Sequence, residues 1–405
     1  MTTIDVVRLI VALITVAALL ALAVRRLPVP YSVALVIFGL AASLVVHDPE
    51  LRVNPEIVLF VLLPGLIFEA AYRLDLHDLR RTFGGVALLA VPGVVISAAA
   101  VAVVLHLATG LSIELGLVVG AMVSATDPVA VIAVFRRMRS PTRLATLVEA
   151  ESLFNDGTGL VLFAITVRSV GVGIDPIGAA GSFVVTVVGS TIVGLMVGYV
   201  GARVIASVND HLIELTVSLA TAYGTYLIAD WLHESGIIAT VIAGVMLGNL
   251  GRDMAMTQRT REAIDTVWEF VAFLFTALVF ILIGLAASAS DLVNSVPWIA
   301  WAVVAVIAGR IVVIYGLLGP ASLIRARLSR GRPIPAAWLH VMMLAGLRGA
   351  VASAMALSLP ADFPQRSLLV AVTFGVVLFT LVIQGGTAEW VVKRLGVGAA
   401  RPAAR

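Results

Sequence analysis

The stretch Ser124-Ala125-Thr126-Asp127-Pro128 lies inside a hydrophobic run that extends from residue 113 to residue 135. A run of about 20 apolar residues can cross the hydrocarbon core of a bilayer as a helix. Pro128 lacks a backbone N–H and disfavours helical geometry at Asp127, so we expect the helix to break here. Asp127 is the expected N-cap of a second half-helix that begins at Pro128. The stretch therefore predicts a discontinuous membrane helix with a carboxylate at its centre.

Composition places the rest of the chain in the membrane as well. Hydrophobic residues make up 60% of the sequence, charged residues only 13%, and the mean hydropathy is +1.08, far above that of a domain with a hydrated surface. Cysteine is absent, which excludes disulfides, thiolate nucleophiles and thiolate metal sites. The first hydrophobic run has Asp5 near its start and Arg25-Arg26 after it, the reverse of a cleavable signal peptide, and is expected to be retained.

Polar breaks divide the chain into thirteen expected membrane spans, and the fold class is accordingly an all-α membrane protein. The expected spans cover residues 4–24, 28–46, 56–72, 83–107, 113–135, 142–168, 176–206, 212–232, 235–250, 262–288, 296–318, 335–359 and 366–391.

Basic residues gather in alternate connections between these spans. The connections after even-numbered spans hold only Arg52, Arg168 and Arg366, whereas those after odd-numbered spans and the C-terminal tail hold nearly all the others. By the positive-inside rule the odd connections are cytoplasmic, so the N-terminus is expected outside and the C-terminus inside a cell membrane. The high pI of about 9.6 thus reflects topology in a lipid bilayer, and nucleic acid is not an expected partner.

The order of the spans predicts an internal repeat. If spans one to six (residues 4–168) match spans eight to thirteen (residues 212–391), the offset is odd and the second half runs in the opposite direction across the membrane. This is the inverted-repeat arrangement of many secondary transporters. Residues 1–405 then form a single transmembrane domain that ends in a short cytoplasmic tail, residues 392–405.

Span twelve, which corresponds to span five, carries the sequence Gly346-Leu347-Arg348-Gly349 near its centre. Two glycines around an arginine suit an unwound segment, and broken backbone at this depth is tolerated only where protein or water surrounds it. We expect the two breaks to cross, with Asp127 offsetting the positive N-termini and Arg348 the negative C-termini of the half-helices. Ordinary proline and glycine kinks are the alternative, which the charge at each centre disfavours.

Span six contains Glu151-Ser152-Leu153-Phe154-Asn155-Asp156-Gly157, whose polar members share one helical face. An ionised carboxylate at the depth of Asp156 costs roughly 2.5 to 3.5 kcal/mol, so something must compensate for it or use it. For Glu151 a buried ion pair is expected, with Arg310 in span eleven as the first candidate partner and Arg348 as the other.

Asp127 and Asp156 have fewer basic partners and are expected to face one cavity. Such a site holds either a proton or a hard cation, because the two compete for the same oxygens. Oxygen ligands suit a small alkali ion. The expected site for Na+ and protons comprises Asp156, Asp127, Thr126, Ser152 and Asn155. Glu69, near the cytoplasmic end of span three, is either an auxiliary carboxylate or an interfacial residue.

These motifs resemble those of the monovalent cation:proton antiporters of the sodium/proton exchanger type. Three motifs carry the resemblance: Ala125-Thr126-Asp127-Pro128-Val129, Glu151-Ser152-Leu153-Phe154-Asn155-Asp156-Gly157 and Gly346-Leu347-Arg348-Gly349-Ala350. It covers nearly the whole chain, although residues 392–405 are far shorter than the regulatory tails of eukaryotic members.

The resemblance implies a homodimer in which a core domain moves against a dimerisation domain. It implies that Asp156 is the principal carrier of ion and proton, that Asp127, Thr126, Ser152 and Glu69 help to bind Na+, and that Glu151 pairs with Arg310. The Asn155-Asp156 pair resembles the electroneutral branch, which exchanges one cation for one proton. No enzymatic activity is expected, and no cofactor beyond the transported Na+ and H+.

Two other functions remain open at this point. Two membrane aspartates could activate water in an intramembrane aspartyl protease, but their local sequences lack the motifs expected for that class. A channel or receptor is disfavoured by the two crossed breaks. Within the exchanger reading, the sequence does not distinguish Na+ from Li+ or K+, so a potassium/proton antiporter is the nearest alternative.

Overall fold

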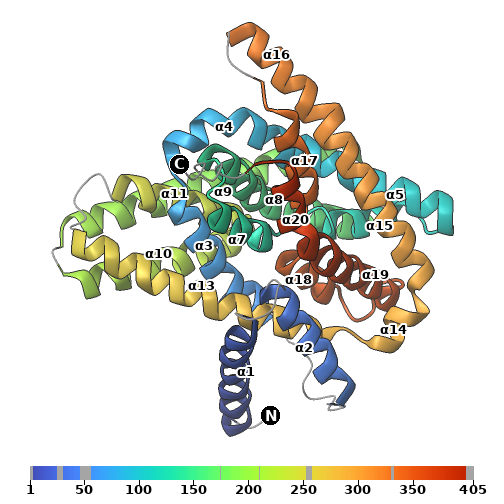
Figure 1. Ribbon diagram of the computed structural model, residues 1–405, viewed down its shortest axis with the longest axis horizontal. Coiled ribbons are helices and arrows are strands. Elements are labelled where there is room, and N and C mark those ends of the chain that lie inside the picture. The colour runs from blue at the N-terminus through green and yellow to red at the C-terminus, as the bar shows by residue number, and fades with distance from the viewer. Residues whose placement is uncertain are drawn as a thin grey trace, which may run out of the picture.

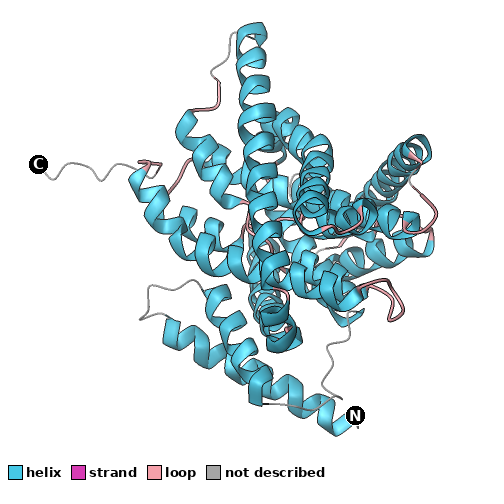
Figure 2. Cartoon of the chain, turned by 90° about the vertical axis from the view of Figure 1, so that its right-hand side faces the viewer, coloured by secondary structure: helices cyan, strands magenta, loops and turns pink. Residues whose placement is uncertain are grey.

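The computed structural model describes residues 3–24, 31–45, 56–173, 175–208, 210–251, 258–329 and 333–397. In these ranges the regular structure is entirely helical, as expected, and no strand occurs (Figure 2). The N-terminal elements, with π-helical turns labelled η, are α1 (Thr3–Val24), α2 (Tyr31–Val45), η2 (Ile57–Leu62), α3 (Leu63–Arg73), α4 (Leu76–Leu88), η3 (Leu89–Gly93), α5 (Val94–Thr109), α6 (Ile113–Met122), α7 (Val129–Met138), α8 (Thr142–Ser169) and α9 (Pro176–Ala206).

The second part of the chain continues the same architecture. Its elements are α10 (His211–Trp231), α11 (Gly236–Met246), η4 (Leu247–Gly251), α13 (Gln258–Ala286), α14 (Ala289–Asn294), α15 (Val296–Ile311), η5 (Val312–Leu318), α16 (Gly319–Ser329), α17 (Ala336–Ala345), α18 (Ala350–Ser358), α19 (Arg366–Phe379), η6 (Thr380–Gly385) and α20 (Gly386–Arg394).

Short polar side chains start several of these helices. Each accepts hydrogen bonds from backbone N–H groups that the first helical turn leaves unpaired, which stabilises the start of a helix by about 1 kcal/mol. The capping side chains include Ser112 before α6, Asp175 before α9, Asp210 before α10 and Ser235 before α11.

The helices follow the expected spans, with two clear differences in length. Span four was expected at residue 83, but α4 begins at Leu76, where the Asp75 side chain caps it. The continuous helix α15–η5–α16 runs to Ser329 rather than to residue 318. In both places charged residues continue the helix beyond its apolar part, where hydropathy no longer reveals it.

Seven helical stretches in the described residues are long and apolar enough to cross a membrane. Four shorter apolar helices, such as Tyr31–Leu44, accompany them. Span six is absent from both groups, since α8 carries Glu149, Glu151 and Asp156 along its length. The chain is therefore a multi-pass membrane protein, while the count of thirteen crossings and their pairing as inverted repeats stay predictions.

Both predicted helix breaks are present. Residues 123–128 separate α6 from α7, and residues 346–349 separate α17 from α18. The two breaks contact each other, because the backbone N–H of Asp127 donates to the carbonyl of Leu347 at 2.9 Å. The expectation for the cap is one residue off: Pro128 is the N-cap and α7 begins at Val129, whose N–H donates to the Asp127 carboxylate at 3.0 Å.

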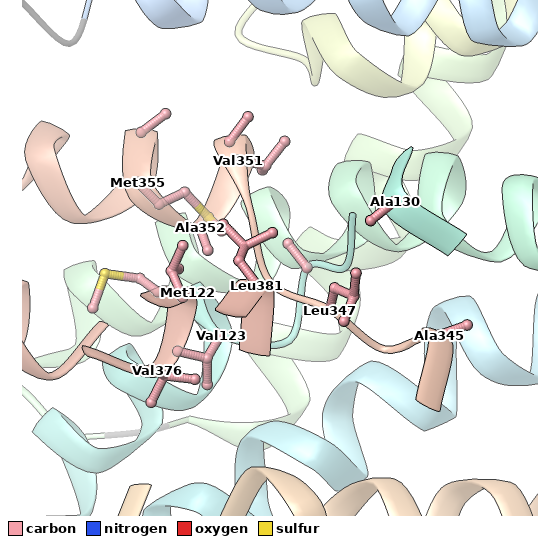
Figure 3. Close-up of a cluster of buried hydrophobic side chains, with 14 of the residues drawn as sticks. Met122, Val123, Ala130, Ala345, Leu347, Val351, Ala352, Met355, Val376 and Leu381 are labelled. Carbon is pink, nitrogen blue, oxygen red and sulfur yellow. The ribbon is translucent and has the colours of Figure 1, made fainter. Parts of the chain in front are cut away.

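Apolar side chains enclose the crossing of the breaks (Figure 3). They come from both sides of each break and from α19 and η6, and all are at least nine-tenths buried. The labelled members are Met122, Val123, Ala130, Ala345, Leu347, Val351, Ala352, Met355, Val376 and Leu381. This packing keeps the non-helical backbone of the breaks inside protein, as the low polarity of a lipid bilayer requires.

The helices surround this centre in two groups (Figure 1). In that view α9, α10 and α11 lie to the left, whereas α5, α15 and α19 lie to the right. Helix α1 projects from the body and packs on α2 and α13. The helices α2 and α13 meet at two glycines, Gly39 and Gly284, where any Cβ would overlap the opposite backbone.

We predict that Gly284→Ala destabilises the protein, because its Cβ would lie 2.8 Å from the Gly39 Cα. Overpacking of this kind costs about 1 to 3 kcal/mol. Gly224→Ala in α10 is the matched control, since nothing lies within 4 Å of its Cβ position and alanine favours a helix by up to about 1 kcal/mol. Thermal unfolding of the purified protein in detergent measures both, and equal midpoints for the two variants would contradict the close packing of α2 on α13.

Candidate functional site

The crossing of the breaks forms one side of a cavity of about 770 Å³. Its walls combine the first break, one face of α7, the middle of α8, the length of α3, part of α13 and the start of α18. Five of the six side chains expected to bind Na+ or protons line it: Thr126, Asp127, Ser152, Asp156 and Glu69. The sixth, Asn155, is not among its lining residues.

Asp127 lies where two half-helices begin. One carboxylate oxygen accepts from Val129 at the start of α7, and the carboxylate also interacts with the backbone N–H of Ala350 at the start of α18. Both helix N-termini direct partial positive charge at this carboxylate. Gly349 packs directly against it, and a Cβ there would lie 2.6 Å from the Asp127 Cβ. The position next to Asp127 therefore requires glycine.

Asn155 attaches the first break to α8. Its Nδ2 donates to the Thr126 hydroxyl at 2.7 Å, while its Oδ1 accepts from the Thr126 backbone N–H at 3.2 Å. The Ser152 hydroxyl donates to the Thr126 carbonyl on the same helix face. The amide of Asn155 is thus engaged at both ends by Thr126, and its side chain positions the break rather than facing the cavity.

Asp156 differs from its neighbours on α8 in having an unsatisfied oxygen. Its Oδ1 is buried and has no hydrogen-bond partner among the residues that the structure describes. The carboxylate lines the same cavity as that of Asp127. A buried carboxylate oxygen without a donor is costly, so this atom is available to a proton or to a cation.

Glu151, one turn before Asn155, is satisfied by an ion pair. Both of its carboxylate oxygens bind the Arg310 guanidinium, with Nη2 to Oε2 at 3.1 Å, and the same Nη2 donates to the Met342 carbonyl at 2.8 Å. Arg348, the other candidate partner, donates instead to the carbonyl of Gly346 at 2.6 Å, at the C-terminal end of α17. Arg310 therefore pairs with the carboxylate of Glu151, whereas Arg348 binds a backbone carbonyl.

Glu69 lies in the wall of the cavity and forms an ion pair with Arg73, one turn along α3. Arg73 also contacts Glu269 of α13 at 3.5 Å. Sequence reasoning missed three further charged residues of this wall, Arg136, Arg137 and Glu149. Glu149 precedes Asp156 by seven residues, two helical turns, and this spacing was the available signal that both share a face of α8.

We predict that Arg310→Ala lowers stability by about 3 to 5 kcal/mol, because it leaves the carboxylate of Glu151 buried without its counter-charge. Lys393→Ala is the matched control: it breaks the exposed Lys393–Glu389 pair, an i,i+4 contact worth about 0.3 to 0.5 kcal/mol. Thermal unfolding in detergent separates the two, and the Glu151→Gln/Arg310→Met double variant should recover part of the loss. Similar losses for Arg310→Ala and Lys393→Ala would contradict a buried pair.

Comparison with known proteins agrees with this geometry. The chain matches the family described as "Sodium/hydrogen exchanger, transmembrane" over residues 11–394. The Na(+)/H(+) antiporter ApNhaP of Aphanothece halophytica is 37% identical over 375 residues, which are 91% of this chain and 70% of that protein. The Na(+)/H(+) antiporter NhaH of Halobacillus aidingensis is 33% identical over 390 residues, 92% of this chain and 94% of that protein.

The fold is also that of a solved structure. The sodium proton antiporter MjNhaP1 from Methanocaldococcus jannaschii superposes with a TM-score of 0.76 at 18% sequence identity, covering 98% of this chain and 99% of that one. The similarity therefore includes the membrane helices from the first to the last. On the family match over nearly the whole length, the chain belongs to the sodium/hydrogen exchangers, which are transporters and not enzymes.

Proposed function

We propose that this protein is a secondary Na+/H+ antiporter whose exchanging site is formed by Asp156 and Asp127. One observation carries the proposal: the two carboxylates line a single cavity at the crossing of two broken helices, and one oxygen of Asp156 has no partner among the described residues. The names of the relatives, Na(+)/H(+) antiporters, point to the same pair of substrates.

The exchange results from competition between Na+ and a proton for one site. When Asp156 is ionised, its free oxygen and the carboxylate of Asp127 attract a cation, and protonation of Asp156 removes that attraction and releases the ion. If the site crosses the membrane only when Na+ or a proton occupies it, the Na+ gradient and the proton gradient are coupled. This scheme needs no cofactor, and the only ligands are the transported Na+ and H+.

We assign the Na+ ligands to the two carboxylates, the Thr126 backbone carbonyl and the Ser152 hydroxyl, all of them oxygens, as a hard cation prefers. The carbonyl of Thr126 belongs to the break, so no helical N–H occupies it, and its hydrogen bond from Ser152 leaves a second lone pair. Asn155 is a positioning residue in this assignment. Glu69 serves as an auxiliary carboxylate in the wall, next to Arg73.

Exchange proceeds, in this proposal, by alternating access. Spans one to six and eight to thirteen form inverted repeats, with the N-terminus outside and the C-terminus cytoplasmic in the cell membrane. Two copies form a homodimer, in which the core with the crossed breaks moves against a dimerisation domain. The alternation of arginine-rich connections supports the orientation.

We further propose that the exchange is electroneutral, one Na+ for one H+. The neighbour of Asp156 is a neutral amide, Asn155, and the nearby carboxylate of Glu151 is neutralised by Arg310. The site then has a single proton-carrying group for each ion that it moves.

Asp156→Asn is expected to abolish Na+ uptake driven by a pH gradient in proteoliposomes, because the amide can neither ionise nor carry the proton. Asp362→Asn, which makes the same change at an exposed position outside the cavity, should leave uptake unchanged. Size-exclusion chromatography checks that both variants are folded. Robust uptake by the Asp156→Asn variant would rule out the assigned carrier.

The stoichiometry is tested with the membrane voltage clamped by valinomycin and K+. An electroneutral exchanger should give the same initial rate of Na+-driven pH change at zero and at about −100 mV, although each net charge moved would be worth about 2.3 kcal/mol at that voltage. A rate that rises with voltage would contradict one-for-one exchange.

With a K+-independent voltage clamp, addition of Li+ or K+ in place of Na+ determines which cation is carried.

A further inference from the structure

A second, smaller cavity of about 260 Å³ lies where α4, α8, α16 and α17 meet. Each of the first three helices contributes one arginine to its wall: Arg81 from α4, Arg143 from α8 and Arg325 from α16. Within the described part of the chain, no Asp or Glu lines this cavity. Three arginines therefore meet in one small space, and none of its described lining residues is acidic.

The three arginines differ in the contacts that their side chains make. Arg325 crosses from α16 to α4, where its Nη2 donates to the Arg81 carbonyl at 3.2 Å. Its Nη1 fills the space beside Gly84, only 3.3 Å from where a Cβ would be. The side chains of Arg81 and Arg143 form no ion pair or hydrogen bond with any residue that the structure describes. Both side chains are exposed, so their guanidinium groups are accessible to a ligand as well as to water.

The arginines of the cavity lie on helices that also carry exposed apolar side chains, and one of these helices is long. The stretch from Val296 to Leu328 has 33 helical residues and is about 50 Å long at 1.5 Å per residue, so it exceeds the hydrocarbon core of about 30 Å. Its last part, α16, extends beyond the body of the protein (Figure 1). Large apolar side chains on other faces of α4 and α16 than the cavity wall remain exposed, namely Phe83 (54%), Leu323 (51%) and Ile324 (58%).

Arginine next to exposed apolar side chains is the pattern of a surface at the level of the lipid headgroups. Trp338 in the cavity wall agrees with that level, since tryptophan concentrates at membrane interfaces. Guanidinium groups bind phosphate oxygens through paired hydrogen bonds. A free phosphate ion would use the arginines but not the apolar surface, whereas a phospholipid uses both.

We propose that this cavity binds the phosphodiester headgroup of an anionic phospholipid, held by Arg81, Arg143 and Arg325, with its acyl chains along the exposed apolar side chains of α4 and α16. The lipid bridges helices from both halves of the chain. One of them, α8, carries Asp156, so the bound headgroup stabilises the helix on which the exchanging carboxylate sits.

The test uses the full-length protein purified in a neutral detergent, with bound lipid counted by native mass spectrometry. Phosphatidylglycerol is titrated against phosphatidylcholine as the zwitterionic probe. Wild-type protein should bind phosphatidylglycerol preferentially, and Arg81→Gln and Arg143→Gln should each weaken that binding about fivefold, since one basic residue near a membrane surface contributes about 1 kcal/mol. Two variants on different helices keep the test valid if one of them fails to fold.

Arg327→Gln is the matched control. It removes the same charge from α16 at an exposed position that does not line the cavity, so phosphatidylglycerol affinity should stay within about twofold of wild type. Equal binding of the two lipids, or an equal loss in Arg327→Gln and Arg143→Gln, would overturn the proposal. Inorganic phosphate is the last probe: binding as tight as that of phosphatidylglycerol, with the same loss in Arg143→Gln, would assign the cavity to soluble phosphate and overturn the lipid.

Discussion

The structure depends on the pairing of two interrupted helices inside the membrane. A helix that breaks in hydrocarbon exposes N–H and C=O groups that no water can satisfy, and each such group costs several kcal/mol. Here each break supplies part of what the other lacks, through the bond from the Asp127 N–H to the Leu347 carbonyl. Asn155 and Ser152 on α8 satisfy the N–H and the carbonyl of Thr126. The proposed ion site lies at the point where these side chains satisfy the broken backbone.

The charges around the crossing divide into structural and functional ones by whether they are satisfied. Glu151 and Arg310 neutralise each other and are nearly inaccessible, at 2% and 6% exposure, while Arg348 is bonded to the end of α17. These groups hold α8, α15 and α17 together. Asp156 lies on the same face of α8 but lacks such a partner, and the cavity reaches it. A transported ion can bind only to oxygen atoms that the protein has not already paired.

Local features of the sequence were sufficient to predict the breaks and the polar face of α8. Pro128 and the pair Gly346 and Gly349 act through their own covalent geometry, which does not depend on the rest of the fold. Arg310 was the first candidate partner of Glu151, and the structure confirms it, whereas Arg348 stayed open from the sequence because it lies at similar depth and only the crossing geometry separates the two. The sequence also did not reveal that the amide of Asn155 is hydrogen-bonded to Thr126, because this contact depends on where the break lies against α8. The first two turns of α4 were not predicted because their arginines lower the local hydropathy.

The contact between Gly349 and Asp127 has a consequence for how such a site can change over generations. The carboxylate occupies the volume that a side chain at Gly349 would need, although the two residues are more than two hundred positions apart in the sequence. Position 349 cannot accept a larger residue while Asp127 stays where it is. A larger side chain at position 349 would therefore have to be accompanied by a change at position 127, which couples two distant parts of the sequence at this one point.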